Sequence, residues 1–204
     1  MSNDKKDKPL VKDLFSKVGL KVQEIPTKPG VKTPDFEIYK DEELIAVCET
    51  KSVRFDNWLV DDIRNNPDVL TVGERKDPIF NRLSDDICTA AKQFESYGSD
   101  RKIPRILTFV NYDKNCGFND LRSTVTGNFY AHDGTVHPLY KNVSEGRAKG
   151  AIEKIDLCLW IEAGNSAVWH WSLDGNEEER REPRKFWVTP SANLPQLNML
   201  IGKI

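Results

Sequence analysis

Residues 33–52, TPDFEIYKDEELIAVCETKS, contain two short apolar runs that are separated by four consecutive charged residues. The first run, residues 36–39, combines aromatic and branched side chains. The second, residues 44–51, is apolar until its last three positions. Such runs favour β-strands, and the charged residues 40–43 between them favour a turn. We therefore predict a β-hairpin in this part of the chain.

The polar residues of this hairpin are spaced so that they meet across its two strands. Successive side chains of a strand point to opposite faces, so Glu49 and Lys51 share one face. A turn in the charged run brings Asp35 opposite Cys48 or Glu49. Because neighbouring strands lie about 5 Å apart, the carboxylates of Asp35 and Glu49 can reach one cation.

Two carboxylates and a lysine on one hairpin are the groups that metal-dependent hydrolysis of a phosphodiester requires. Mg²⁺ prefers oxygen ligands and retains several waters, so two protein carboxylates and a carbonyl are sufficient. The ion activates a water and neutralises charge on the phosphate. A lysine beside it either accepts a proton or orients and stabilises charge. The sequence leaves that choice open, as it does the number of metal ions.

The same residues carry a resemblance to a known family. Pro34-Asp35 followed by Glu49-Thr50-Lys51 resembles the PD-(D/E)XK nuclease superfamily, which has the restriction-endonuclease-like fold. Gln93 and Tyr97, in the segment AAKQFESYG, resemble the QxxxY element of RecB-like members. The resemblance covers roughly residues 10–113, about half of the chain.

The resemblance implies an α/β fold in which a mixed central sheet lies between helices, with additional β-hairpins in the C-terminal half. It implies that Asp35 and Glu49 bind Mg²⁺ or Mn²⁺ and that the carbonyl of Thr50 adds a ligand. Lys51 would be catalytic, and Gln93 would support the site. The implied activity is that of a nuclease, with DNA as the expected substrate and endonucleolytic cleavage as the expected mode, in restriction, repair or defence against mobile elements. The sequence leaves DNA against RNA and endonuclease against exonuclease open.

Further site residues are predicted less directly. An acidic residue of the first helix or of the strand after it joins some sites of this family, and Asp13 and Glu24 are the options here. The residues that we expect to contact nucleic acid are Tyr97, Arg54, Arg101 and Lys102. The net charge of −2 and the pI of about 6.0 exclude a globally basic nucleic-acid binder, so any phosphate contacts must come from local patches.

Each of these patterns also has a plainer interpretation. A Glu-x-Lys pair is common on exposed strand faces and contributes little energy. Gln93 and Tyr97 are four residues apart, so they also fit a helix flank that packs its tyrosine. The alternative to an enzyme is a catalytically inactive module that retains the fold and binds nucleic acid or protein.

The rest of the chain reads as one domain, residues 1–204, with a core motif region at 9–113 and the remaining sheet and elaborations at 114–204. The start, residues 1–8, is hydrophilic and is expected to be disordered. The long mixed segment 54–77 is a candidate substrate-binding element. The predicted helices are 9–18, 78–97, 118–125 and 144–152. The predicted strands beyond the hairpin are 20–25, 106–110, 128–131, 135–139, 155–161, 167–173 and 185–189, the last two as edge strands.

Aromatic and sulfur-containing side chains complete the expectations. The last two strands carry Trp169, Trp171, Phe186 and Trp187, which either pack in the core or stack on bases beside nearby arginines. Three of the four cysteines lie in apolar runs, which predicts reduced, buried thiols in a cytoplasmic protein. We find no run long enough for a membrane helix and expect no membrane partner. Double-strand cleavage would suit a homodimer.

Overall fold

The computed structural model describes residues 4–27, 29–54, 79–98, 103–131, 133–139, 145–164, 167–173 and 184–187. Within these residues, seven strands form one sheet in the order β1-β2-β3-β4-β7-β8-β9. The sheet strands are β1 (Lys21–Glu24), β2 (Phe36–Lys40), β3 (Glu43–Val53), β4 (Arg105–Asn111), β7 (Leu157–Glu162), β8 (Ala167–Ser172) and β9 (Arg184–Trp187). The helices are α1 (Asp4–Lys17), α3 (Ile79–Tyr97), α4 (Phe118–Thr126) and α5 (Glu145–Ile152). A separate hairpin pairs β5 (Asn128–Tyr130) with β6 (Val136–Pro138).

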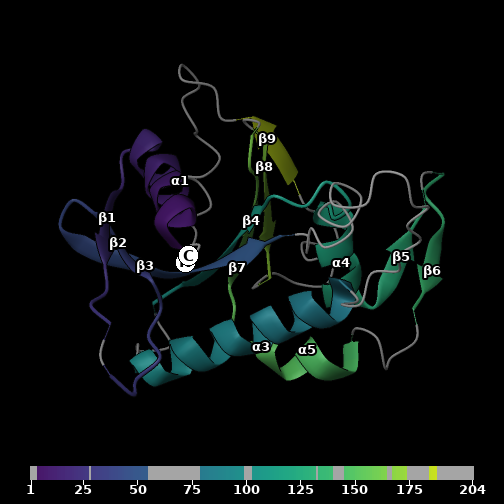
Figure 1. The fold of residues 1–204 in the computed structure, drawn as a ribbon, viewed down its shortest axis with the longest axis horizontal. Coiled ribbons are helices and arrows are strands. Elements are labelled where there is room, and N and C mark those ends of the chain that lie inside the picture. Colours follow the sequence, from purple (N-terminus) through teal and green to yellow (C-terminus); the bar gives the residue numbers. More distant parts are fainter. Residues whose placement is uncertain are drawn as a thin grey trace, which may run out of the picture.

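The sheet is mixed and lies between two layers of helices. Strands β1, β2 and β3 are antiparallel, β3, β4 and β7 are parallel, and β8 and β9 return antiparallel. Helix α1 covers one face, and α3, α4 and α5 lie on the other (Figure 1). The predicted α/β class with a mixed central sheet is therefore confirmed, as are the extra hairpins. Strand β8 lies inside the sheet between β7 and β9, so its prediction as an edge strand is wrong.

The motif hairpin forms as predicted. Phe36 of β2 pairs with Cys48 of β3. Asp41 and Glu42 have positive φ angles of 48° and 68°, which suits the tight two-residue turn that matches the twist of a hairpin. Strand β3 continues past Lys51 to Val53, because it pairs in parallel with β4 as far as Asn111.

Helix α1 begins earlier than predicted. The expected disorder of residues 1–8 is wrong for Asp4–Lys8, which are helical, and the helix passes through Pro9. The reason is a buried carboxylate, since Asp7 is only 3% exposed. Its Oδ1 accepts hydrogen bonds from the Arg54 guanidinium at 3.0 Å and from the Tyr112 hydroxyl at 2.7 Å. The first turn of α1 is thereby attached to the ends of β3 and β4.

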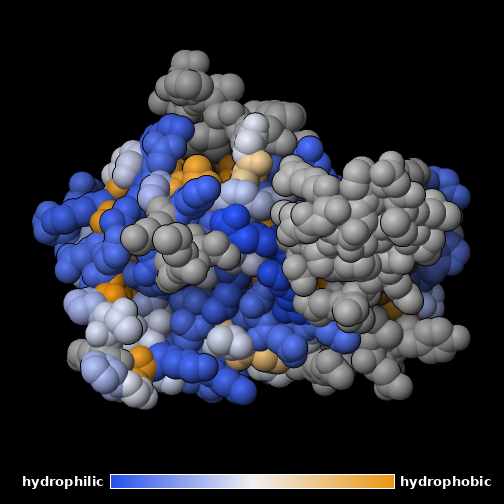
Figure 2. Space-filling model, viewed as in Figure 1, coloured by the Kyte–Doolittle hydropathy of each residue, from blue (hydrophilic) through white to orange (hydrophobic). Residues whose placement is uncertain are grey.

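The core has two apolar halves, one on each face of the sheet. Side chains of α1 such as Val11 and Phe15 fill the first half, and side chains of α3 such as Leu83 and Ile87 fill the second. Trp160 is fully buried in the second half. Figure 2 shows that the coloured surface on this side is mainly hydrophilic, with apolar residues in small separate groups.

Two of the four C-terminal aromatic residues can be placed. Trp171 is 1% exposed, and Trp169 stacks on Phe118 with ring centroids 5.0 Å apart and planes 6° apart. Packing, rather than base stacking, is confirmed for these two rings. The side chains of Phe186 and Trp187 lie outside the described residues.

Cys48, Cys116 and Cys158 are buried and Cys88 is half-buried, and none of these four described cysteines forms a disulfide. Residues 55–77 of the candidate substrate-binding segment 54–77 lie outside the described residues, so its predicted role stays a prediction. No helix in the described part of the chain is long and apolar enough to cross a membrane.

We predict that Asp7→Ala lowers the free energy of unfolding by about 2–3 kcal/mol, because it leaves the Arg54 guanidinium and the Tyr112 hydroxyl without their shared acceptor. Urea unfolding followed by circular dichroism measures this change. The control is Asp13→Ala, since Asp13 is an exposed partner of Lys17 and its loss should cost at most about 0.5 kcal/mol. Equal effects of the two substitutions would contradict the docking of the first turn.

Candidate active site

The candidate site lies just before the start of β2, beside the part of β3 that extends past the end of β2. The N–H of Asp35 donates to the carbonyl of Cys48 at 3.0 Å, which extends the ladder one residue before Phe36. At the next rung, the N–H of Thr50 donates to Oδ2 of the Asp35 side chain at 2.9 Å. A carboxylate thus takes the place of a main-chain acceptor. The Asp35 side chain is thereby fixed against the edge of β3.

The carbonyl of Thr50 also points toward this edge. In a strand, the N–H and C=O of one residue lie on the same side. Because the Thr50 N–H points to Asp35, the Thr50 C=O points to the same side of β3. Thr50 therefore offers a carbonyl oxygen beside the Asp35 carboxylate, at the position predicted for a third ligand.

Glu49 lies opposite Asp35 and is almost completely buried. The register that pairs Phe36 with Cys48 places Asp35 across from Glu49, and Glu49 is only 3% exposed. Its Oε1 accepts a hydrogen bond from Lys51 Nζ at 2.7 Å. Its Oε2 is buried without a hydrogen-bond partner among the described residues. Buried oxygens of this kind are costly unless a ligand uses them.

This environment changes the protonation of Glu49. Burial raises the pKa of the Glu49 carboxyl from its ordinary 4.5 to about 7. The negative charge of Asp35 adds to the rise, and the Lys51 ammonium opposes it. Near neutral pH, Glu49 is therefore divided between its acid and carboxylate forms. A cation that binds its carboxylate form must displace a proton.

Lys51 connects the hairpin to α3. Its Nζ donates both to Glu49 and to Gln93 Oε1, the latter at 2.8 Å. The amide Nε2 of Gln93 in turn donates to the carbonyl of Thr33 at 3.0 Å. Gln93 thus holds the lysine from one side and the segment before Asp35 from the other.

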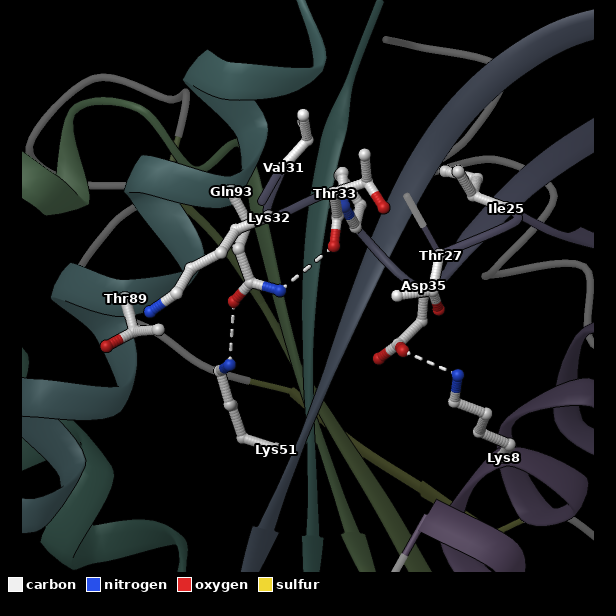
Figure 3. Close-up of a pocket in the computed structure, with 11 residues that line it drawn as sticks. Lys8, Ile25, Thr27, Val31, Lys32, Thr33, Asp35, Lys51, Thr89 and Gln93 are labelled. Carbon is white, nitrogen blue, oxygen red and sulfur yellow. Dashed lines mark hydrogen bonds and ion pairs between the residues drawn. The ribbon is translucent and has the colours of Figure 1, made fainter. Parts of the chain in front are cut away.

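A cavity of about 370 Å³ opens above these residues. Asp35, Lys51 and Gln93 line it, as do two lysines that the sequence did not single out, Lys8 and Lys32. Figure 3 shows Lys8 reaching from α1 to Asp35 on one side, and Gln93 and Thr89 projecting from α3 on the other. Lys8 Nζ lies 2.8 Å from Asp35 Oδ1. Three lysines against the single carboxylate of Asp35 in its lining make the cavity suited to an anion.

The other predicted residues lie elsewhere. Tyr97 donates its hydroxyl to Glu37 of β2, which also accepts from Tyr39 at 2.8 Å. The Arg54 guanidinium binds Asp7 and lies over the Tyr112 ring, 3.7 Å from its centroid. Both side chains are therefore engaged inside the fold. Arg101 and Lys102 lie outside the described residues.

The two optional acidic residues do not join the cavity. Asp13 pairs with Lys17, and Glu24 pairs with Lys12, in both cases between exposed side chains. Neither lines the cavity. The acidic residue of α1 that the fold does bury is Asp7, which the sequence analysis assigned to a disordered start.

Lys8 and Lys32 are the residues that sequence reasoning missed. Lys8 stands three and seven residues before Val11 and Phe15, so it shares the face of α1 that meets the core. This spacing indicates that Lys8 belongs to the helix, although the charged residues around it favoured a prediction of disorder. Lys32 and Thr89 carried no local signal, because the cavity brings together segments that are far apart in the sequence.

The donor set fits a hard divalent ion with an incomplete protein shell. Among the described residues, no three His, Cys, Asp or Glu side chains gather closely enough to hold a metal ion. Two carboxylates and the Thr50 carbonyl remain, which suits Mg²⁺ because that ion keeps several waters and binds substrate phosphates. The unpartnered Glu49 Oε2 is the observation that favours this fit.

Comparisons with protein-family models, with curated proteins and with solved structures found no match to this chain. No family is therefore shown for it. The functional conclusion depends on the geometry of the cavity and on the chemistry of its residues.

We predict that the contribution of Glu49 to the stability of the protein without metal falls as pH rises from about 4.5 to 7. The native state keeps the Glu49 proton up to a pKa of about 7, whereas the unfolded chain loses it near 4.5. The folded state thus binds more protons in this window. Glu49→Gln mimics the protonated form and should gain on the order of 2–3 kcal/mol over wild type between pH 4.5 and pH 8.

Urea unfolding in EDTA across this pH range measures the difference. Glu24→Gln is the control, because hydrogen bonding to Lys12 lowers the pKa of exposed Glu24. That substitution should give no gain as pH rises. A pH-independent difference between Glu49→Gln and wild type would contradict the burial argument.

Proposed function

We propose that this protein is a Mg²⁺- or Mn²⁺-dependent nuclease that hydrolyses phosphodiester bonds, with DNA as its substrate and endonucleolytic cleavage as its mode. The observation that carries the proposal is the buried, unpartnered Glu49 Oε2, which lies on the strand opposite Asp35 and beside Lys51. A buried carboxylate oxygen on the strand beside a lysine-lined cavity, next to Lys51 of that lining, is most simply explained as a ligand for a cation.

The charges of the cavity support an anionic substrate. Lys8, Lys32 and Lys51 all line it. A phosphodiester carries one negative charge per linkage, and lysines act as point charges toward it. The chain as a whole is slightly acidic, so this local concentration of lysines is the feature that would attract a nucleic acid.

Three groups of this chain would hold the cation: the carboxylates of Asp35 and Glu49 and the carbonyl of Thr50. When bound, Mg²⁺ supplies Lewis acidity that activates a water and neutralises charge on the phosphate. Asp35 is fixed for this role by the Thr50 N–H. Glu49 is fixed by Lys51, with one oxygen left for the ion.

Lys51 is assigned a donor role. Its ammonium donates to Glu49 and to Gln93, so its position is set by two acceptors on different elements. A third N–H of the same ammonium is left to point into the cavity that Lys51 lines. Lys51 would therefore orient the attacking water or stabilise charge on the phosphate. Gln93 acts through Lys51 and is a positioning residue.

The proposal extends to the family. The hairpin order, the parallel crossover through α3 and the position of Gln93 on that helix agree with a restriction-endonuclease-like fold of the RecB-like type. This agreement supports the PD-(D/E)XK assignment together with the Asp35, Glu49 and Lys51 pattern. Helix α1 contributes Lys8 to the site, whereas some members of this family have an acidic residue on their first helix there.

The second candidate function is a binding module that has lost catalysis. The ion pair between Lys8 and Asp35 favours it, because that pair neutralises one of the two carboxylates. In this case the protein would bind nucleic acid through its lysines without cutting it. Binding of Mn²⁺ without cleavage of any nucleic acid would support this alternative.

We predict that the protein nicks supercoiled plasmid DNA and degrades linear DNA in Mg²⁺ or Mn²⁺, and that EDTA abolishes both activities. Glu49→Ala should lower the cleavage rate at least about 100-fold, because it removes a buried carboxylate ligand and one of the two acceptors that hold Lys51. Gel assays over time measure the rates.

The matched control is Glu43→Ala, at the exposed first position of the same strand. It should cleave at the wild-type rate. Cleavage that persists unchanged in Glu49→Ala would remove the proposed mechanism, and so would equal losses in the two variants.

We predict that substitutions of Gln93 and Tyr97, the two named residues of the QxxxY element, have different effects. Gln93→Leu removes the contacts to Lys51 and Thr33 and should slow cleavage about 10- to 100-fold, while Mn²⁺ affinity stays near the wild-type value. Tyr97→Phe removes only the bond to Glu37, so cleavage should stay within about twofold and stability should fall by about 1 kcal/mol. Cleavage rates, Mn²⁺ titration and urea unfolding provide the three readouts. A Tyr97→Phe variant as slow as Gln93→Leu would show that Tyr97 acts on the substrate.

A further inference from the structure

The two carboxylates of the site differ in how many of their oxygens already have a hydrogen-bond or ion-pair partner. Asp35 engages both of its oxygens, Oδ1 with Lys8 at 2.8 Å and Oδ2 with the Thr50 N–H at 2.9 Å. Glu49 engages Oε1 with Lys51 and leaves Oε2 without a partner among the described residues. A cation that binds Asp35 through Oδ1 therefore competes with the Lys8 ammonium for that oxygen.

Lys8 is placed so that it can leave without disturbing the fold. Its neighbour Asp7 is buried and holds the first turn of α1 against Arg54 and Tyr112. The side chain of Lys8 is 25% exposed, and its Nζ lies at the cavity wall, 5.7 Å from the centroid of the Phe36 ring. The backbone is thus fixed, while the ammonium has open cavity beside it.

The charge balance of the cavity indicates which group the Lys8 ammonium binds after it leaves Asp35. Without a cation, the two carboxylates are balanced by Lys8 and Lys51. A divalent ion then adds two positive charges to a cavity that also contains Lys32. The group that restores balance is a polyanion, and a phosphodiester backbone supplies one negative charge per linkage.

We propose that Lys8 exchanges partners during substrate loading: it occupies Asp35 while the site is empty of cation, and it binds a backbone phosphate of the nucleic acid once Asp35 joins Glu49 in holding the ion. This inference rests on the proposed nuclease function. It assigns Lys8, a residue outside the Asp35, Glu49 and Lys51 pattern, as a substrate-binding residue that competes with the metal.

The exchange makes metal and nucleic acid bind cooperatively. Partly exposed ion pairs contribute at most about 1 kcal/mol, so Lys8 weakens cation binding by about two- to fivefold and is displaced readily. The released ammonium then adds one phosphate contact. Each ligand therefore raises the affinity for the other by the same factor, as linkage requires.

The test compares wild type, Lys8→Met and the control Lys12→Met. Lys12 lies one turn further along α1, with its Nζ 5.9 Å from the same Phe36 centroid, but it pairs with Glu24 and does not line the cavity. Mn²⁺ affinity without nucleic acid is measured by titration with detection of free Mn²⁺. Affinity for a short DNA duplex is measured by fluorescence anisotropy in EDTA and in Ca²⁺. Circular dichroism checks that each variant is folded.

We expect Lys8→Met to bind Mn²⁺ about two- to fivefold more tightly than wild type. In Ca²⁺ it should bind DNA about five- to tenfold more weakly, with a salt dependence reduced by about one phosphate contact. The gain in DNA affinity from EDTA to Ca²⁺ should shrink by at most the smaller of these two factors, about two- to fivefold, because Lys8 couples the two ligands only as far as it competes with the cation. Lys8→Arg should keep the wild-type DNA affinity, and Lys12→Met should match wild type throughout.

The outcomes separate this inference from the proposed function. If wild type cleaves DNA but Lys8→Met binds Mn²⁺ no more tightly, or binds DNA equally well, the exchange is overturned and the nuclease stands. If wild type binds Mn²⁺ and DNA cooperatively, with the expected Lys8 effects, but cuts nothing, the exchange stands and catalysis is overturned. A wild type that binds no Mn²⁺ overturns both.

Discussion

The hydrogen bond from the Thr50 N–H to the Asp35 carboxylate is the interaction on which the cavity depends. A hairpin normally continues its ladder with main-chain acceptors. Here the first strand begins at Phe36, and a side chain supplies the next acceptor. This substitution fixes Asp35 against β3 and turns the Thr50 carbonyl toward the same edge. Two of the three groups proposed to meet a cation, the Asp35 carboxylate and the Thr50 carbonyl, lie at the edge that this hydrogen bond defines.

The burial of Glu49 imposes a cost that the fold does not remove. Lys51 satisfies one oxygen of the carboxylate, while the other stays dry and unpartnered within the described structure. A polar group left in this state lowers stability, and groups of this kind are concentrated at functional sites because a ligand offsets the cost. The raised pKa of Glu49 expresses the same cost as a preference for the neutral acid. Stability and cation binding are thus opposed at this residue.

The sequence contained the local part of this arrangement and lacked the distant part. The hairpin, the pairing of Asp35 with Glu49 and the helix that carries Gln93 followed from strand alternation, turn residues and helical spacing, which are short-range properties. The helical start of α1 did not follow, because the partners of Asp7 are Arg54 and Tyr112, which are 47 and 105 residues away. A run of charged residues indicates disorder until a distant donor is known to bury one of them.

The same distinction explains which predicted binding residues are engaged by other parts of the fold. Arg54 and Tyr97 were expected at the nucleic acid because basic and aromatic side chains suit it. Their partners, the buried Asp7 and the half-buried Glu37, are carboxylates on other elements, and such carboxylates bind nearby donors. The cavity is lined by three lysines and Asp35, with Glu49 on the strand beside it. Two acids hold a cation only weakly, so the anion that the lysines attract is needed to complete its shell. In the proposed mechanism, substrate and ion therefore arrive together, and this dependence follows from the number of protein ligands.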